Sequence, residues 1–559
     1  MNFKKIFIIL VTLLLFSGCK LFTNLFTGGQ YEEKTKTIEI DTSKGTKNKV
    51  YLVKLNVSDQ KIQASKTGII TATRDADEEI ADSGFFDTDQ LIRNQNHELN
   101  QIMSETVRSA ARAGESESSY IKNSAQTTEQ TFSVGAAGPD FKAFTKIVNG
   151  VEVSETISTK CVYAGKHCYI FADTSVSESD LHKRGIILST DNYKALGEKF
   201  DACYELEIEK LGNPYYEKYN SRYYAPCNKK IRILITDLFG DAYYKNAQDN
   251  QLYTGGTLGY FYSGDIFSQS YLNKMYTNIL NQKKYFSNEC EMFYIDSFFL
   301  TWREETVYST LVHEFNHMIN YVIKTLNYMT DNPNATGFNS CSTWYTEMLS
   351  MVTEDMFQDY LKVDDQDSPK ARLPYFNNYY IYGFKNWNEW KTTDAELLYM
   401  YANTYAFGAF LARNFGGVKL VSAIAKNPYV DELSITSGLK ECGYTDVDFN
   451  EALRRFSNCL FDVKDISSDN YYSFNKESKD STDAKLYFKA IDINNITLKD
   501  STGGIYKYPA RIFSASDRED IWPYGFSVHY VGENLTSFDV ALNTDSCSIE
   551  YYLLTSYYQ

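Results

Sequence analysis

The stretch 310–320 contains the pattern H-E-x-x-H, and it constrains this chain more than any other part of its sequence. Apolar residues recur around it at helical spacing, which predicts one helix over residues 304–323. His313 and His317 are four residues apart on one face of that helix, so their imidazoles can converge on a tetrahedral zinc ion. Glu314 is rotated by about 100° from His313 and can hold a metal-bound water without being a ligand.

The H-E-x-x-H match is not expected by chance. The chain has 6 histidines in 559 residues, and a composition of this kind gives on the order of 0.004 such matches per chain. The alternative is a helix with two hydrogen-bonded histidines and one surface glutamate. The helical context favours the metal-binding hypothesis.

A second helix is predicted after the Asn-, Asp-, Pro- and Gly-rich stretch 327–340. From Trp344 onward, apolar residues occupy one helical face, while Glu347, Ser350 and Glu354 share another. A catalytic zinc needs three protein ligands and one open position, and the intervening stretch is long enough to bring the chain back to the histidines. Glu347 can therefore reach the position of a third ligand, with Glu354 as the first alternative. A merely solvated acidic face is the competing hypothesis.

These residues resemble the gluzincin metallopeptidases and, within them, the hyicolysin-like family, over roughly residues 160–460. The resemblance rests on three segments: His313-Glu-Phe-Asn-His317, Trp344-Tyr-Thr-Glu347-Met-Leu-Ser and Tyr401-Ala-Asn-Thr-Tyr405-Ala-Phe-Gly-Ala-Phe-Leu-Ala-Arg413-Asn-Phe-Gly-Gly. It implies an α+β, zincin-like core, in which a mixed sheet is joined to a helical subdomain with the active-site helix. It also implies that His313, His317 and Glu347 bind Zn²⁺, and that Glu314 is the general base and acid.

Two further roles follow from the same resemblance. Tyr405, on a predicted third helix, is the candidate donor to the oxyanion, and a buried aromatic side chain is the alternative. Some gluzincins carry an acid four residues after the ligand glutamate, where this chain has Met351. Ser350 or Glu354 is therefore the candidate that orients a ligand.

The amino terminus has the features of an export signal. Two lysines precede an apolar run over residues 6–16, and Ser17 and Gly18 come just before Cys19. This arrangement resembles a bacterial lipobox, although Phe16 stands where an aliphatic residue is usual. The resemblance implies cleavage before Cys19 and attachment of lipid to its thiol, and an ordinary secretory signal is the alternative. No other stretch reaches 18 apolar residues, so this lipid would be the only membrane anchor.

Export makes the other cysteines informative. Of the 10 cysteines, nine follow Cys19, so at least one thiol is free or paired between molecules. Cys161 and Cys168 lie in a run that predicts two strands joined by a tight turn around Ala-Gly-Lys-His. Facing positions in a hairpin are close enough for a disulfide, and we predict one here. Two buried free thiols are the alternative.

The pattern along the chain predicts a mixed α/β core between β modules. Near both ends of the chain, apolar and polar residues alternate, which predicts strands. Between them, the sequence predicts a helix at 193–211 and buried strands at 231–237 and 292–300, and this mixture indicates an α/β core. A helix is also predicted near 88–112. We predict the following segments: a signal peptide (1–18), a tether (19–35), a small β module (36–75), a polar connector (76–144), a zincin-like domain (145–465) and a C-terminal β module (485–559).

The net charge of the chain reduces the number of functions that it could have. The chain has 56 Lys and Arg against 72 Asp and Glu, a formal charge of −16, which argues against a nucleic-acid partner. The best hypothesis is an exported, lipid-anchored zinc metalloendopeptidase that acts on protein or peptide substrates. One alternative is a surface adhesin or ligand-binding lipoprotein that keeps the zincin fold without chemistry. Another is a latent enzyme in which segment 36–135 is a removable propeptide.

Overall fold

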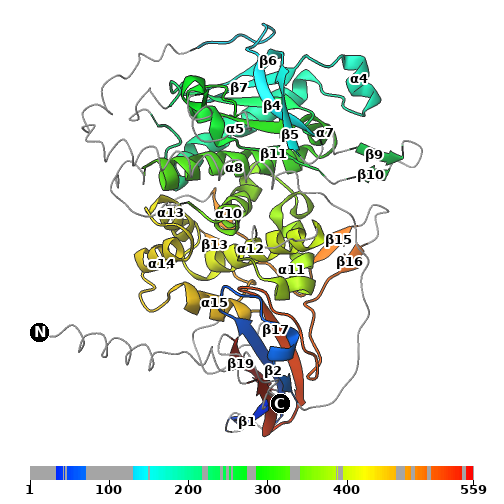
Figure 1. Ribbon diagram of the computed structural model, residues 1–559, viewed down its shortest axis with the longest axis vertical. Coiled ribbons are helices and arrows are strands. Elements are labelled where there is room, and N and C mark those ends of the chain that lie inside the picture. The colour runs from blue at the N-terminus through cyan, green and yellow to red at the C-terminus, as the bar shows by residue number, and fades with distance from the viewer. Residues whose placement is uncertain are drawn as a thin grey trace, which may run out of the picture.

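The computed structural model shows an α+β chain arranged in three parts along its long axis (Figure 1). We call them the sheet lobe (strand β4 to helix α8), the helical lobe (α10 to α15) and the β module (β1 to β3 with β17 to β19). The structure describes residues 33–41, 43, 47–70, 130–148, 151–216, 224–239, 243–246, 251–253, 256–273, 285–327, 340–385, 387, 394–460, 472–479, 485–499, 505–543 and 549–557.

A five-stranded sheet forms the centre of the sheet lobe. Its order is β11 (Gly259–Tyr260), β12 (Met292–Asp296), β8 (Ile231–Thr236), β7 (Cys168–Asp173) and β6 (Thr159–Ala164). Strands β12, β8 and β7 are parallel, while β11 and β6 are antiparallel edges. Strands β8 and β12 are buried along their whole length, as expected for parallel strands that are covered on both faces.

Helices cover one face of this sheet and a hairpin covers the other. Phe293 and Tyr294 are consecutive on β12 and so point to opposite faces. The Phe293 ring packs on Phe200 of α5 (Thr190–Leu211), and Phe200 in turn packs on α8 (Glu304–Asn320) through Phe315. The opposite face meets the hairpin of β4 (Phe141–Val148) and β5 (Val151–Ile157) through contacts such as Phe141 with Phe171. The H-E-x-x-H helix is therefore held against the sheet by its apolar side.

The predicted core elements are largely confirmed, with one correction. Helix 193–211 corresponds to α5, and strand 231–237 corresponds to β8. The predicted strand 292–300 is strand only to Asp296, whose carboxylate accepts from the Phe299 amide at 3.0 Å and caps α7 (Ser297–Trp302). An apolar run alone does not distinguish a buried strand from a buried helix, and the capping aspartate determines where β12 stops.

The helical lobe packs directly below α8. Its helices are α10 (Thr343–Leu361), α11 (Leu373–Tyr379), α12 (Asp394–Asn414), α13 (Val418–Lys426), α14 (Asp431–Glu441) and α15 (Phe449–Ser457). Helix α10 lies in the middle, because it contacts both α8 and α12. Helix α8 continues into a π-helix over Tyr321–Asn327, so the predicted helix 304–323 extends slightly further than expected.

Strands from the two ends of the chain form one β module. Strand β2 (Asn48–Asn56) is central in a sheet between β17 (Phe526–Glu533) and β19 (Ile549–Tyr557). A second sheet joins β1 (Glu33–Glu39), β18 (Ser537–Asn543) and β3 (Ile69–Ile70). The blue and red strands lie side by side at the lower end of Figure 1. The prediction of separate N- and C-terminal β modules is therefore wrong.

The remaining described elements are short. They are α4 (Glu178–Lys183), β9 (Tyr243–Asn246), β10 (Gln251–Tyr253), β13 (Ser478–Lys479), β14 (Tyr487–Phe488), β15 (Thr497–Lys499), β16 (Ile505–Lys507) and 3₁₀ turns at Ala64–Lys66, Ser263–Ile266, Asp365–Asp367, Pro369–Arg372 and Tyr380–Tyr382. The predicted signal peptide with Cys19 and the predicted helix 88–112 lie outside the described residues. Within the described part, no helix combines the length and apolar character needed to cross a bilayer.

The predicted disulfide between Cys161 and Cys168 is not formed. Both thiols are free and buried. Strands β6 and β7 do form the expected hairpin, but its turn lies at residues 165–168, and after an irregularity in the pairing between Cys161 and Tyr163, Cys161 faces Phe171. Cys168 instead lies at the turn, where its carbonyl accepts from the Gly165 amide at 2.9 Å. The alternative of two buried thiols agrees with the structure.

Candidate metal centre

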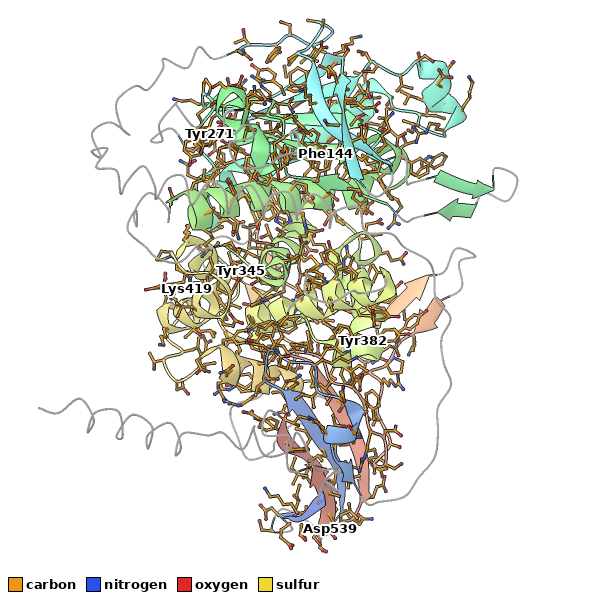
Figure 2. The ribbon with its side chains drawn as sticks, viewed as in Figure 1. Phe144, Tyr271, Tyr345, Tyr382, Lys419 and Asp539 are labelled. Atoms are coloured by element: carbon orange, nitrogen blue, oxygen red, sulfur yellow. The ribbon has the colours of Figure 1, made fainter. Side chains whose placement is uncertain are left out.

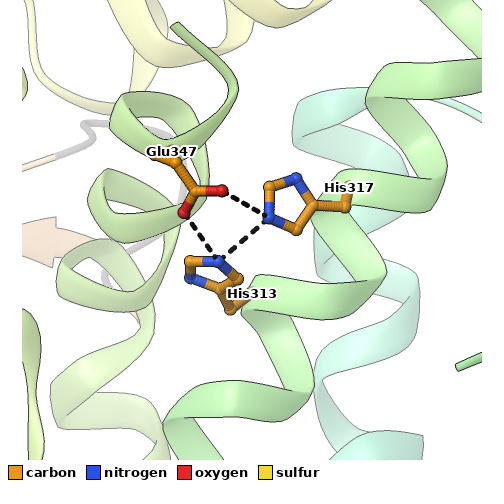
Figure 3. A group of neighbouring side chains, drawn as sticks. All are labelled: His313, His317 and Glu347. Carbon is orange, nitrogen blue, oxygen red and sulfur yellow. Dashed lines mark hydrogen bonds and ion pairs between the residues drawn. The ribbon is translucent and has the colours of Figure 1, made fainter. Parts of the chain in front are cut away.

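Two helices bring the predicted ligands together at the junction of the sheet lobe and the helical lobe. His313 and His317 project from α8, and Glu347 projects toward them from the second turn of α10 (Figure 3). The helices meet because each has an apolar stripe, and both stripes are part of one continuous core. The polar faces of the two helices therefore lie against each other beside that core.

The donor atoms have the spacing that a zinc ion requires. Nε2 of His313 lies 3.0 Å from Nε2 of His317 and 3.3 Å from Oε2 of Glu347. Nε2 of His317 lies 3.5 Å from Oε1 of Glu347. Zinc ligands at about 2.0–2.1 Å in a tetrahedron are separated by roughly 3.3 Å. Among the described residues, these three side chains are the group of His, Cys, Asp or Glu donors that converges in this way. The donor set therefore fits Zn²⁺.

The electrostatics of the site favour a bound cation. Burial alone would lower the pKa of His313, but the carboxylates of Glu354 and Glu347 raise that pKa well above its ordinary value. Glu347 itself is only 1% exposed. Two carboxylates beside two imidazoles stabilise a positive charge at this point, whether it is carried by a proton or by a metal ion.

The side chains proposed to orient ligands contact both histidines. Oε1 of Glu354 lies 2.7 Å from Nδ1 of His313, and Ser309 donates to Oε2 of the same carboxylate at 2.5 Å. Ser350 lies 3.4 Å from Nδ1 of His317 and donates to Oδ1 of Asn316 at 3.0 Å. Each Nδ1 thus has a polar neighbour on the side away from the metal position, which fixes the ring orientation.

Glu314 lies on α8 next to the first ligand and is 4% exposed. It is not a member of the converging group, in agreement with a role other than ligation. A carboxylate beside the open position of a zinc ion can hold a water molecule and accept its proton. Its placement is therefore compatible with general base catalysis.

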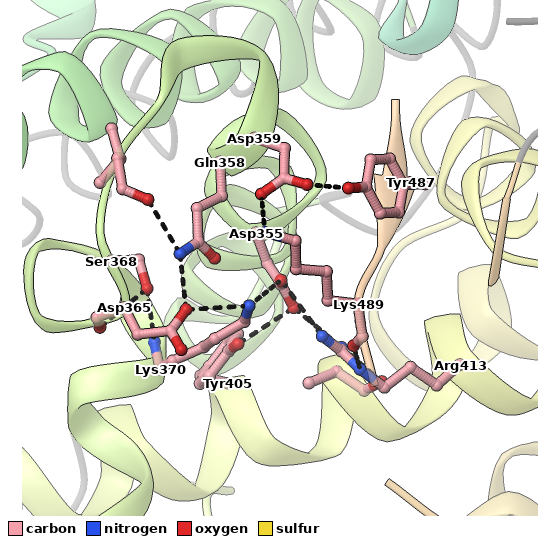
Figure 4. Close-up of polar contacts among 12 residues, drawn as sticks. Asp355, Gln358, Asp359, Asp365, Ser368, Lys370, Tyr405, Arg413, Tyr487 and Lys489 are labelled. Atoms are coloured by element: carbon pink, nitrogen blue, oxygen red, sulfur yellow. Dashed lines mark hydrogen bonds and ion pairs between the residues drawn. The ribbon is translucent and has the colours of Figure 1, made fainter. Parts of the chain in front are cut away.

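Tyr405 lies in a different polar network. Its hydroxyl donates to Oδ2 of Asp355 at 3.0 Å, and Arg413 forms two hydrogen bonds with the same carboxylate, at 2.8 and 3.2 Å (Figure 4). Asp355 is eight residues beyond Glu347, which is about 12 Å along the axis of α10. The described contacts do not join Tyr405 to the histidines, and the arrangement matches the alternative of a buried aromatic side chain.

The pair of Asp355 and Arg413 is expected to stabilise the helical lobe. Both side chains are 1% exposed or less, so Arg413→Met would leave a buried carboxylate without its main partner. We expect a loss of about 3 kcal/mol in the free energy of unfolding, measured by urea denaturation. Lys183→Met, which removes one partner of an exposed pair with Asp180, is the control and should change stability by less than about 1 kcal/mol. Equal effects of the two variants would contradict the role given to Arg413.

Glu354→Gln should weaken metal binding and activity together. The amide keeps the size of the side chain but can no longer hold the His313 ring as an anionic acceptor at Nδ1. Loss of such a partner typically costs about 10–100-fold in metal affinity or activity. Competition with a chelator measures the affinity. Glu198→Gln, an exposed glutamate on α5, serves as the control. An unchanged zinc affinity in Glu354→Gln would show that Glu354 does not support the ligand.

Four supporting residues were given no role from the sequence. Ser309 lies four residues before His313 on the same helical face, a spacing that could have identified it. Asp355 and Arg413 gave no comparable signal, because a buried ion pair between two helices depends on how the helices pack. The role of Asn316 likewise follows only from the structure, in which it accepts a hydrogen bond from Ser350.

Comparisons with known proteins agree with the chemistry of these residues. No protein-family model matches the chain. Over 302 residues, 52% of the chain, the sequence is 24% identical to a protein named "Neutral metalloprotease ShpI" from Staphylococcus hyicus. The matched region covers 55% of that protein, so the chain spans little more than half the length of this relative. The chain is thus distantly similar to a metalloprotease over about half of its length.

Proposed function

We propose that this protein is a zinc-dependent metallopeptidase of the gluzincin type, and that it hydrolyses peptide bonds in protein or peptide substrates. One observation carries the proposal. His313, His317 and Glu347 converge at tetrahedral spacing, with Glu354 on the far nitrogen of one ligand. The distant similarity to a neutral metalloprotease supports the same reaction class.

In this proposal each residue has a distinct task. His313, His317 and Glu347 would hold Zn²⁺, which would supply Lewis acidity and lower the pKa of a bound water toward neutrality. Glu314 holds the attacking water by hydrogen bonding, accepts its proton and returns that proton to the leaving amine. Glu354 keeps the His313 ring oriented through Nδ1. We assign no oxyanion role to Tyr405, because its hydroxyl is bonded to Asp355.

The direct test combines metal content with proteolysis. The purified full chain should contain close to one zinc per molecule and should cleave unfolded casein. A chelator should abolish the cleavage, and added Zn²⁺ should restore it. The adhesin hypothesis predicts no cleavage, because a binding protein needs no general base. Zinc without cleavage of any unfolded substrate would favour the adhesin, and absence of both zinc and cleavage would refute the peptidase.

The propeptide hypothesis finds no support in the β module. Removal of segment 36–135 would take away β2, which is the shared partner of β17 and β19. It would also expose the apolar side chains of Val531, Phe538 and Val540, which pack in one buried cluster with Val50 and Leu52 of the removed segment. We therefore propose that the described N-terminal strands belong to the working protein.

We also propose that the protein is exported and held at a bacterial membrane by lipid on Cys19. The apolar run followed by Ser17 and Gly18 supports this proposal. Cys19→Ala should release the protein into the soluble fraction or leave it unprocessed, measured by fractionation and by the mass of the amino-terminal peptide. Cys442→Ala, which removes a thiol in the helical lobe, is the control and should keep the parent distribution. Normal membrane retention of Cys19→Ala would contradict lipidation.

A further inference from the structure

A cavity of about 200 Å³ lies in the sheet lobe, and none of its lining residues belongs to the metal centre. We call it the edge cavity. Its titratable lining residues are Asp173, Glu178, His182, Tyr193 and Asp237, and two hydroxyl residues, Thr236 and Ser297, also line it.

The edge cavity is a product of the sheet topology. Asp173 ends β7, Asp237 directly follows β8, and Ser297 directly follows β12. These three strands are parallel and adjacent, so their carboxyl ends open on the same edge. Ligands of open α/β sheets bind at this edge. Helices α4 and α7 lie at this side of the sheet lobe in Figure 1.

The walls of the edge cavity carry excess negative charge. Arg184 forms an ion pair with Asp237, which compensates that carboxylate. Asp173 accepts a hydrogen bond from the Thr236 hydroxyl at 2.7 Å and has no basic partner among the described residues. Burial and then the charge of Asp173 raise the pKa of Tyr193 to about 12, so this carboxylate lies close to the aromatic wall. Its charge is available to a positively charged ligand.

Ser297 provides an independent indication of a ligand. Ser297 is 5% exposed, and its hydroxyl has no hydrogen-bond partner in the described structure. Buried hydroxyls are nearly always hydrogen-bonded, because an unsatisfied one is costly. A donor group bound in the edge cavity would satisfy this oxygen.

The size and the spacing of the acceptors indicate an organic cation and not a metal ion. In the described part of the chain, metal-type donors converge only at His313, His317 and Glu347. A volume of 200 Å³ is about six to seven times the share of one water in the liquid. A planar guanidinium has five donors for separated acceptors and stacks well on an aromatic ring such as Tyr193.

We propose that the edge cavity binds a guanidinium group, with Asp173 as the charged acceptor, Ser297 as a neutral acceptor and Tyr193 as the aromatic wall. The group could be an arginine side chain of a polypeptide or a free guanidinium amine. Trp302 is 40% exposed and Ile187 is 57% exposed, and both lie beside this end of the sheet. Trp302 donates to the Gly185 carbonyl at 2.8 Å, next to the lining residue Ile186. This exposed apolar rim favours the polypeptide, whose backbone would lie across it.

The test measures binding to the full chain in the Glu314→Ala background, in which peptide cleavage does not interfere. The probes are N-acetyl-arginine-N-methylamide, its neutral citrulline isostere, and agmatine as the free cation. By titration calorimetry or saturation-transfer NMR we expect a Kd on the order of 1 mM for the arginine amide. The citrulline amide should bind at least about tenfold more weakly, because it lacks the charge. Tighter binding of the amide than of agmatine identifies the polypeptide as the source, and the reverse identifies the free amine.

Variants then locate the site. Asp173→Asn should weaken the arginine amide about tenfold, and Ser297→Ala should weaken it by a smaller factor. Glu178 is a second carboxylate of the cavity wall, and its side chain is 88% exposed, so Glu178→Gln removes a negative charge without risk to the fold. This variant should weaken binding about twofold. Asp539→Asn is the matched control, at the opposite end of the molecule (Figure 2).

Equal binding of arginine and citrulline probes, no saturable binding, or unchanged affinity in both Asp173→Asn and Glu178→Gln would overturn the proposal. Because binding here needs no metal, its failure leaves the proposed peptidase activity untouched, and loss of peptidase activity would not abolish it.

Discussion

Glu314→Ala is expected to keep zinc and stability close to those of the parent protein while kcat/KM for an unfolded substrate falls by roughly 10³-fold. The physical reason is that general acid–base catalysis typically contributes about 10²–10⁴-fold, and the substitution removes the proposed proton acceptor without touching His313, His317 or Glu347. The side chain is 4% exposed but is not part of the converging donor group. Removing it should therefore affect the reaction much more than the metal.

Three measurements separate the outcomes for this variant: zinc content, thermal midpoint and casein cleavage. Glu198→Ala is the matched control, since it removes an exposed glutamate of α5 that pairs with Lys194 at 3.8 Å. The control should retain full activity. If Glu314→Ala and the parent cleave casein at the same rate, Glu314 is not the general base. If Glu314→Ala loses its zinc as well, its role is structural.

The sequence predicted which side chains converge at the candidate metal centre better than it predicted their surroundings. His313 and His317 could be identified because i, i+4 spacing on a helix determines their relative position without tertiary information. Glu347 required one more step, namely a second amphipathic helix whose polar face carries the acid. The structure brings these three side chains together, with Glu354 and Ser350 on the far nitrogens. Local periodicity therefore contains most of the information needed to place the ligands.

Pairing over long distances could not be predicted in the same way. Alternation along residues 48–56 shows that one face of a strand is buried, but it does not show which strand lies next to it. The structure pairs that strand with 526–533 and 549–557, almost 500 residues away. Tyr405 shows the same limit. Its hydrogen bond to Asp355, and the bond of Arg413 to the same carboxylate, form because α10 packs on α12. The pattern of one helix alone does not reveal that packing.

Register was the third feature that the sequence left undetermined. The run from Cys161 to Cys168 correctly predicted a hairpin, but its turn lies at residues 165–168, so Cys168 closes the turn while Cys161 lies opposite Phe171. The position of the turn determines which residues face each other across a hairpin, so a disulfide predicted from spacing alone fails when the turn lies elsewhere.

Glu347→Gln is expected to release zinc while leaving the fold intact. Structural zinc sites bind with apparent free energies of about 10–16 kcal/mol, shared among four ligands, so loss of one anionic ligand should cost roughly 10²–10³-fold in affinity. Oε2 and Oε1 of Glu347 lie 3.3 and 3.5 Å from the Nε2 atoms of the two histidines, on the side where those nitrogens converge. Glutamine keeps the size of the side chain but removes its charge.

The measurement is zinc retention during titration with a competing chelator, with circular dichroism as the check on folding. Glu291→Gln is the matched control, because Glu291 is also fully buried but accepts its hydrogen bonds from the Asn228 amide on the sheet lobe. It should bind zinc as the parent does. Retention of zinc in Glu347→Gln would mean that another acid is the third ligand, and Glu354→Gln should then show the larger loss. The geometry argues against that result, because Glu354 contacts Nδ1 of His313, on the other side of the ring from the atoms that converge.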